Sequence, residues 1–200
     1  MKRKTLDLTM SVGGILIAAL AIVLGFVFQA NADFATTYVR DQLNEQRIMF
    51  PAAEYLSESE ANVPCLVEFA GTSLDSGKKS ECYANEYIGS HLKGIGGGET
   101  YATLGTPQRE LQAKVADAKK ANDPNLPTLE AELAKVSGQR DSMFKGETLR
   151  GLLLTTYGFS VLGEKAALAA TIAFFAAAIV ILASLAGFAH ALATPKDQKI

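Results

Sequence analysis

Two long stretches without a charged side chain constrain this chain more than any other feature. The first runs from Leu8 to Ala32, 25 positions, and the second from Ala166 to Pro195, 30 positions. At about 1.5 Å rise per residue, a helix of either length crosses the roughly 30 Å hydrocarbon core of a bilayer. A soluble monomer would have to bury both stretches in a small core. We therefore predict two transmembrane helices, over residues 8–30 and 166–193.

The first stretch has two possible roles. The basic residues Lys2, Arg3 and Lys4 precede it, and Ala30-Asn31-Ala32 fits the cleavage pattern of a secretory signal peptide. However, the apolar segment from Leu8 to Phe28 has 21 positions, whereas the apolar part of a signal peptide has about 7 to 15. The length favours a membrane anchor that stays in the mature protein, with a cleaved signal peptide as the alternative.

The distribution of basic residues predicts how the chain is oriented. Lys2, Arg3 and Lys4 lie in the tail of residues 1–7, and Lys196 and Lys199 lie in the tail of residues 194–200. Short basic segments beside transmembrane helices stay in the cytoplasm. We expect a multi-pass protein of the plasma membrane with both termini in the cytoplasm and residues 31–150 as an extracytoplasmic domain.

Cys65 and Cys82 are the two cysteines of the chain, and both lie in the central segment. They do not form a C-x-x-C motif, which would lower a thiol pKa for redox chemistry. An even number of cysteines in an exported, core-poor domain favours a disulfide. We predict a structural Cys65–Cys82 bridge; two free buried thiols, or catalytic or metal-binding thiols, are the alternatives.

The central segment is expected to be helical, with short helices and a longer hairpin. Thr106-Pro107 is typical of a helix start, and that helix should run to about Ala121. Residues 122–127 form a turn, and a second helix begins near Thr128. Apolar residues recur at helical spacing in both helices, so the two should pack as an antiparallel pair. The predicted fold class is mostly α: two transmembrane helices flanking a small, disulfide-stapled helical domain that contains an antiparallel hairpin.

Three further stretches have other expected roles. Residues 56–63 are acidic and are expected to be solvated, and residues 94–98 (Gly-Ile-Gly-Gly-Gly) are expected to form a flexible linker. Residues 151–165 are apolar, carry Tyr157 and Phe159, and are too short to span a bilayer. We predict that they lie along the outer membrane surface; the alternative is that they extend the second transmembrane helix from about Thr148.

Small residues recur along one face of each apolar stretch. Close packing of such faces drives helices together in lipid, where the hydrophobic effect does not. The faces could pack on each other or on the helix of another protein, and the sequence leaves both open. The predicted helix-packing residues are Ser11, Gly14, Ala18, Ala21 and Gly25 in the first stretch, and Ala169, Ala173, Ala176, Ala183 and Gly187 in the second.

Little in the sequence points to chemistry. The net charge of −2 provides no basic surface for nucleic acid. The chain has two histidines and two cysteines, and neither apolar stretch contains Asp, Glu, Lys or Arg. We therefore predict no catalytic, cofactor-binding or metal-binding residues, no small-molecule substrate and no enzymatic activity of the chain itself.

Several longer strings resemble a known family. They are residues 1–7 (Met-Lys-Arg-Lys-Thr-Leu-Asp), residues 81–88 (Glu-Cys-Tyr-Ala-Asn-Glu-Tyr-Ile), residues 144–154 and the closing Thr194-Pro195-Lys196. The chain resembles the actinobacterial respiratory supercomplex association factors over nearly its whole length. That resemblance implies an accessory subunit that accompanies cytochrome bcc and cytochrome aa3 oxidase in electron transport and has no catalytic, haem or copper residue of its own.

The resemblance and the residues together lead to one expected function. We expect a non-enzymatic accessory or assembly subunit of a membrane complex, contributing association or stabilisation, with lipid and the bcc and aa3 oxidase subunits as partners. The alternative is a stand-alone, membrane-anchored extracytoplasmic receptor, sensor or binding protein.

Overall fold

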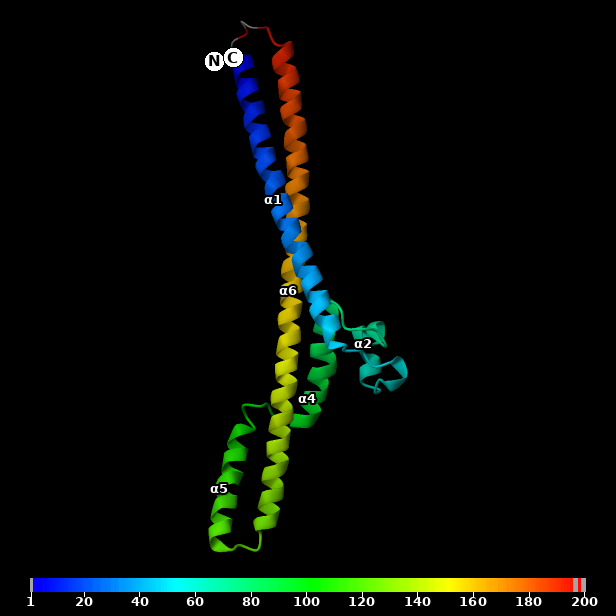
Figure 1. Ribbon diagram of the computed structural model, residues 1–200, viewed down its shortest axis with the longest axis vertical. Coiled ribbons are helices and arrows are strands. Elements are labelled where there is room, and N and C mark those ends of the chain that lie inside the picture. Colours follow the sequence, from blue (N-terminus) through cyan, green and yellow to red (C-terminus); the bar gives the residue numbers. More distant parts are fainter. Residues whose placement is uncertain (1, 196–197, 199–200) are drawn as a thin grey trace. The chain divides into compact units, whose positions relative to one another are not determined.

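Two long helices carry the two apolar stretches. In the computed structural model, which describes residues 2–195 and 198, α1 spans Arg3–Gln46 and α6 spans Leu126–Ala193 (Figure 1). By length and composition, each is apolar and long enough to cross a membrane. The shorter elements lie between them in the chain. The described residues contain no β-strand, and Met49 and Ser73 form an isolated antiparallel bridge.

The chain divides into two compact units. The helix-pair unit comprises the residues up to Tyr38 and those from Phe159 onward, and the central unit comprises Val39–Gly158. In the helix-pair unit, α1 and the C-terminal part of α6 run side by side and antiparallel (Figure 1). The backbone N–H of Arg3 donates to the carbonyl of Gln198 at 3.2 Å, so these two residues lie at the same end of the pair.

The central unit begins with short helices held by a disulfide. It contains two single-turn 3₁₀ helices, Ala53–Tyr55 and Glu60–Asn62, then α2 (Pro64–Phe69), α3 (Gly77–Cys82), a π-helical segment (Tyr83–Ile88) and α4 (Gly89–Gly96). The Cys65–Cys82 disulfide joins α2 to the end of α3. This confirms the predicted pairing.

Local sequence explains several of the helix boundaries. Pro64 occupies the first turn of α2, where a missing N–H costs no hydrogen bond. The Ser76 hydroxyl caps α3 by accepting from the backbone N–H of Lys79. Gly97 (φ 60°) ends α4 and Asn122 (φ 50°) ends α5 (Gly105–Ala121) in the left-handed conformation that glycine and asparagine tolerate best.

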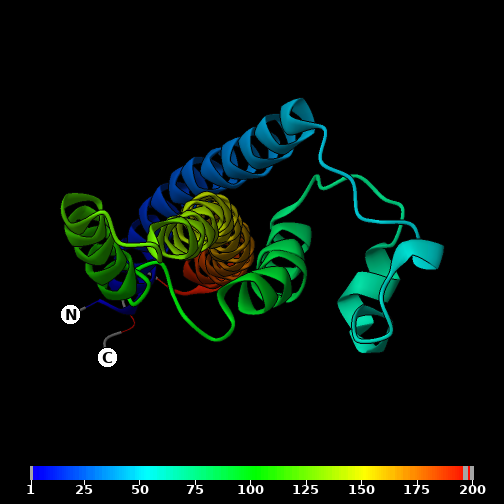
Figure 2. The same ribbon diagram turned by 90° about the horizontal axis from the view of Figure 1, so that it is seen from below.

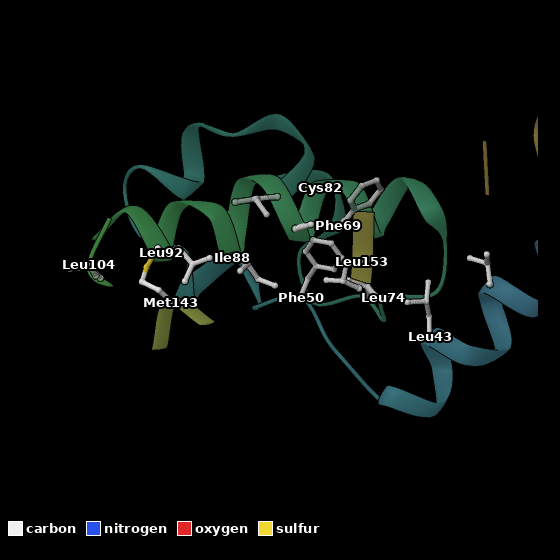
Figure 3. Packing of buried hydrophobic residues seen from close by; sticks show 13 residues of the cluster. Leu43, Phe50, Phe69, Leu74, Cys82, Ile88, Leu92, Leu104, Met143 and Leu153 are labelled. Carbon is white, nitrogen blue, oxygen red and sulfur yellow. The ribbon is translucent and has the colours of Figure 1, made fainter. Parts of the chain in front are cut away.

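A compact apolar core joins these short helices to the beginning of α6. Leu66 and Leu74 are almost completely buried at its centre. Figure 3 shows the Phe50 and Phe69 side chains from two different segments close together, with ring centroids 5.6 Å apart. The labelled members of the core in Figure 3 also include Leu43, Cys82, Ile88, Leu92, Leu104, Met143 and Leu153.

The predicted hairpin is present. Helix α5 (Gly105–Ala121) folds back beside the beginning of α6 in both Figure 1 and Figure 2. Val115 and Ala118 of α5 are buried, and Lys119 forms an ion pair with Glu130 at 2.8 Å near the turn. At the other end of the hairpin, the Gln108 amide donates to the Ser137 hydroxyl at 3.0 Å.

The structure differs from the sequence expectations at three other places. The helix from the first apolar stretch continues beyond the predicted residues 8–30 and ends at Gln46, where Arg47 adopts a left-handed conformation (φ 51°). The segment 56–63 is not wholly solvated, since Glu60 is buried. Residues 94–96 belong to α4, so the glycine-rich segment is partly helical.

Residues 151–165 are helical throughout. They belong to α6, which runs without interruption from Leu126 to Ala193. This path corresponds to the alternative of one long helix, although the helix begins well before Thr148. The position of this segment at a membrane surface stays a prediction.

Candidate functional site

The predicted small-residue face of α1 lies at the contact with α6. Ser11, Ala18 and Gly25 are buried, and Gly14 and Ala21 are half-buried between them. Ala32 continues the buried line. The fully buried positions recur every seven residues, which is the spacing of helices that pack along a left-handed seam.

The face of α6 that packs against α1 lies next to the small-residue face that the sequence predicts. Ala169, Ala173 and Gly187 are half-buried, whereas Ala176 and Ala183 are exposed. The buried line instead consists of small residues at a regular spacing of seven: Gly163, Ala170, Ala177, Ser184 and Ala191. The second apolar stretch has alanines on every face of the helix, so its composition does not single out the face that packs.

Two serine–glycine contacts hold the pair together at one end. A Cβ atom added at Gly14 would collide with the hydroxyl of Ser184, and one added at Gly187 would collide with the hydroxyl of Ser11. Each helix thus presents a serine that fills the space above a glycine of the other helix. The two contacts are equivalent, because both helices carry the pattern Ser-x-x-Gly and run in opposite directions.

The contacts keep one register along the whole pair. Farther from the chain ends, Gly25 lies against the Phe174 ring, where an added Cβ would be 2.6 Å away. A Cβ added at Gly163 would be 2.8 Å from the Cβ of Ala35. Moving one residue toward the C-terminus of α1 therefore corresponds to moving one residue toward the N-terminus of α6. In consequence, Ala32 at the end of the first apolar stretch lies near the level of Ala166 at the start of the second, and the second stretch extends past the level of Leu8.

Polar residues mark one end of the pair. There, His190 Nδ1 lies 2.8 Å from the Asp7 carboxylate and links the two helices just beyond the serine–glycine contacts. At the other end, Phe34, Tyr38 and Phe159 form a cluster of aromatic rings, with centroids 5.6 to 6.3 Å apart.

The helix pair has small residues inside and large apolar residues outside. Large side chains on the outside of the pair are exposed over most of their surface; examples are Leu16, Ile17, Phe175, Ile179 and Leu182. A water-soluble pair would bury these side chains, since exposed apolar patches of this size lead to association. The arrangement is the one expected for helices surrounded by lipid.

The central unit contains a buried carboxylate that the sequence analysis does not predict. The Glu60 carboxylate accepts hydrogen bonds from the Ser57 hydroxyl at 2.6 Å and the Ser57 N–H at 2.8 Å. Its other oxygen lies 3.1 Å from Nε2 of His91, which belongs to α4. The Ser57 hydrogen bonds lower the pKa of Glu60, and burial partly opposes them. The Ser57-x-x-Glu60 spacing of a capping box could have drawn attention to this pair.

One exposed surface of the central unit has the composition of a protein contact. The Tyr101 and Phe144 rings lie 5.5 Å apart, and the Arg140 guanidinium lies 4.3 Å from the Tyr101 centroid. These residues border a hollow of about 250 Å³, together with Gln108, Ser137 and Asp141. Tyrosine, arginine and phenylalanine are enriched where proteins bind one another. We call this the Tyr101–Arg140–Phe144 surface.

The structure offers no comparable grouping of metal-binding side chains. Among residues 2–195 and 198, no three His, Cys, Asp or Glu side chains come together in a way that could hold a metal ion.

No protein-family model, curated protein or solved structure matches this chain.

Proposed function

We propose that this chain is a non-enzymatic accessory or assembly subunit of a membrane complex, anchored in the plasma membrane by its helix pair. The observation that carries the proposal is the packing of that pair, with small residues inside and large apolar residues outside over a membrane-length stretch. Such a pair is stable in lipid and would expose a large apolar surface in water.

The proposed orientation places both termini in the cytoplasm and the central unit outside. The contact between Arg3 and Gln198 supports a common side for the two ends. The basic residues of the N-terminal tail favour the cytoplasmic side. The Cys65–Cys82 disulfide supports an oxidising compartment for the central unit.

Because the small residues of the two helices pack on each other, we place the docking surface for a partner elsewhere in the chain. Ser11, Gly14, Ser184 and Gly187 are engaged by the pair itself, so they hold the anchor together and are not available to pack on another helix. We assign docking to the Tyr101–Arg140–Phe144 surface of the central unit. The resemblance described above identifies the proposed partners as the cytochrome bcc and aa3 oxidase subunits.

Affinity purification from membranes in mild detergent tests this function. The full-length chain should bring down bcc and aa3 subunits in stoichiometric amounts. Replacement of Phe144 by alanine should reduce their recovery at least about tenfold, corresponding to roughly 1.4 kcal/mol of lost binding free energy. A matched control is Tyr55→Ala, which removes a more exposed aromatic ring elsewhere in the central unit and should leave recovery unchanged.

The result that rejects the proposal is a monodisperse chain without any stoichiometric partner. Recovery of a different membrane complex would keep the accessory role and reject the respiratory assignment. Equal recovery with Phe144→Ala and Tyr55→Ala would reject the assigned surface.

A further inference from the structure

The aromatic cluster at the end of the helix pair is exposed without an evident structural need. Phe34, Tyr38 and Phe159 are 59%, 51% and 37% exposed, respectively. The Phe34 and Tyr38 rings of α1 stack with centroids 5.6 Å apart, and the Phe159 ring of α6 lies across the pair, 6.1 Å from Tyr38 and 6.3 Å from Phe34. A soluble helix pair would gain little from three large rings arranged on its surface.

The cluster lies where charged residues resume on both helices. Asp33 directly precedes Phe34, and Glu164 and Lys165 follow Phe159 within two turns of α6. Between these charges and the Asp7–His190 pair, neither helix carries Asp, Glu, Lys or Arg. The cluster therefore lies at the boundary of the apolar stretch, on the side opposite the chain ends.

The distance between the two ends fits a bilayer. From Asp7 to Phe34 there are 27 residue steps, or about 40 Å at 1.5 Å per residue. A bilayer is about 40 to 45 Å thick when its headgroup layers are included. With the Asp7–His190 pair at one headgroup layer, the aromatic cluster reaches the other.

We propose that the Phe34–Tyr38–Phe159 cluster binds the phospholipid headgroup layer of the outer leaflet and sets the depth of the helix pair in the membrane. The rings lie among the glycerol and carbonyl groups, and the Tyr38 hydroxyl reaches water. Aromatic side chains prefer this layer because one end of the ring system is apolar and the other is hydrated. The proposal rests on the membrane placement in the proposed function, but it needs no protein partner.

Tryptophan fluorescence with brominated lipids gives a direct test, because the chain has no tryptophan of its own. Three single-tryptophan variants of the full-length chain are compared in phosphatidylcholine–phosphatidylglycerol vesicles: Phe159→Trp in the cluster, Phe175→Trp on the exposed face within the apolar stretch, and Tyr55→Trp in the central unit. Phe159→Trp should be quenched about twofold more by bromine near the headgroup than by bromine near the chain ends. Phe175→Trp should show the reverse order, and Tyr55→Trp should not be quenched.

The three variants separate failure of this inference from failure of the proposed function. If Phe175→Trp is quenched but Phe159→Trp emits as in water, the chain spans the membrane and the cluster is not at its surface. In that case the inference is overturned. Quenching of Phe159→Trp mainly by deep bromine overturns it as well. If neither variant is quenched, the chain is not inserted, and the proposed function fails too. Far-UV circular dichroism confirms that each variant is folded.

Discussion

Single atoms decide how the two long helices meet. Gly14 has no room for a Cβ because the Ser184 hydroxyl occupies that space, whereas the neighbouring Gly13 has nothing within 4 Å. The two glycines have the same helix propensity and lie on the same turn. They therefore form a matched pair for testing the contact.

The first prediction concerns this contact. Gly14→Ala should lower the free energy of unfolding by about 1 to 3 kcal/mol, since an added carbon in a filled space forces neighbouring atoms apart. Gly13→Ala should be neutral or slightly stabilising, because alanine favours helix and meets no neighbour. Detergent titration to the unfolded state, followed by circular dichroism, measures both.

A second substitution tests whether the collision with the Ser184 hydroxyl causes the loss of stability in Gly14→Ala. Adding Ser184→Gly to Gly14→Ala moves the bulk from one helix to the other and should recover most of the lost stability. Without such recovery, the effect of Gly14→Ala comes from something other than its contact with Ser184.

Glu60 provides a prediction about pH. The hydrogen bonds from Ser57 lower its pKa in the folded protein, so its charged form contributes stability above the unfolded-state pKa of about 4.3. That contribution is lost as the pH falls through the lower, folded-state pKa. Glu60→Gln should therefore be less stable than the wild type at pH 7, and the difference should shrink at acidic pH.

Urea unfolding of the full-length chain between pH 7 and pH 3 measures that difference. Glu58→Gln is the control, because Glu58 is exposed two residues away and should show little difference from the wild type at any pH. A constant gap between Glu60→Gln and the wild type over the whole range would mean that ionisation of Glu60 is not involved.

At the scale of elements, the sequence predicted some faces well and others poorly. The α1 face was identifiable because its small residues are few among Leu, Ile, Val and Phe. In the second apolar stretch alanine occurs on all sides, and only the packing against α1 selects Ala170, Ala177 and Ser184. The hairpin of α5 and α6 followed from its turn residues, whereas the π-helical segment had no recognisable signal.

The disulfide should matter most among the short helices. It closes a loop with a sequence separation of 17 residues, which corresponds to about 3 kcal/mol of stability in the chain-entropy description. The double variant Cys65→Ala/Cys82→Ala should therefore unfold at a lower temperature than the wild type. A reducing agent should lower the unfolding temperature of the wild type and leave that of the double variant unchanged.

Mass spectrometry of the unreduced chain checks the premise. The peptides containing Cys65 and Cys82 should be recovered as one linked species. Alkylation of both cysteines before any reduction would show that the two thiols are free in the natural protein.

The whole molecule carries a prediction about topology. Because both native cysteines are in the disulfide, a cysteine introduced at Leu126 or at Gln198 would be the single free thiol. In intact cells, a membrane-impermeant thiol reagent should label Leu126→Cys and should label Gln198→Cys only after the membrane is opened. Labelling in the opposite pattern would reverse the proposed orientation.

The seven-residue spacing of the seam also restricts how such a protein evolves. One inserted residue rotates everything beyond it by about 100°, which would turn the small residues of one helix away from the other. An insertion of seven residues keeps the small residues on the same face of the helix. The other helix must then gain seven residues as well, so that the charged residues at the ends of the two helices stay at the same depth. The two spans are thus expected to change length together, in increments of about 10 Å. Smaller differences in membrane thickness would be met by tilt, and single-residue insertions and deletions should be rare in both spans among related sequences.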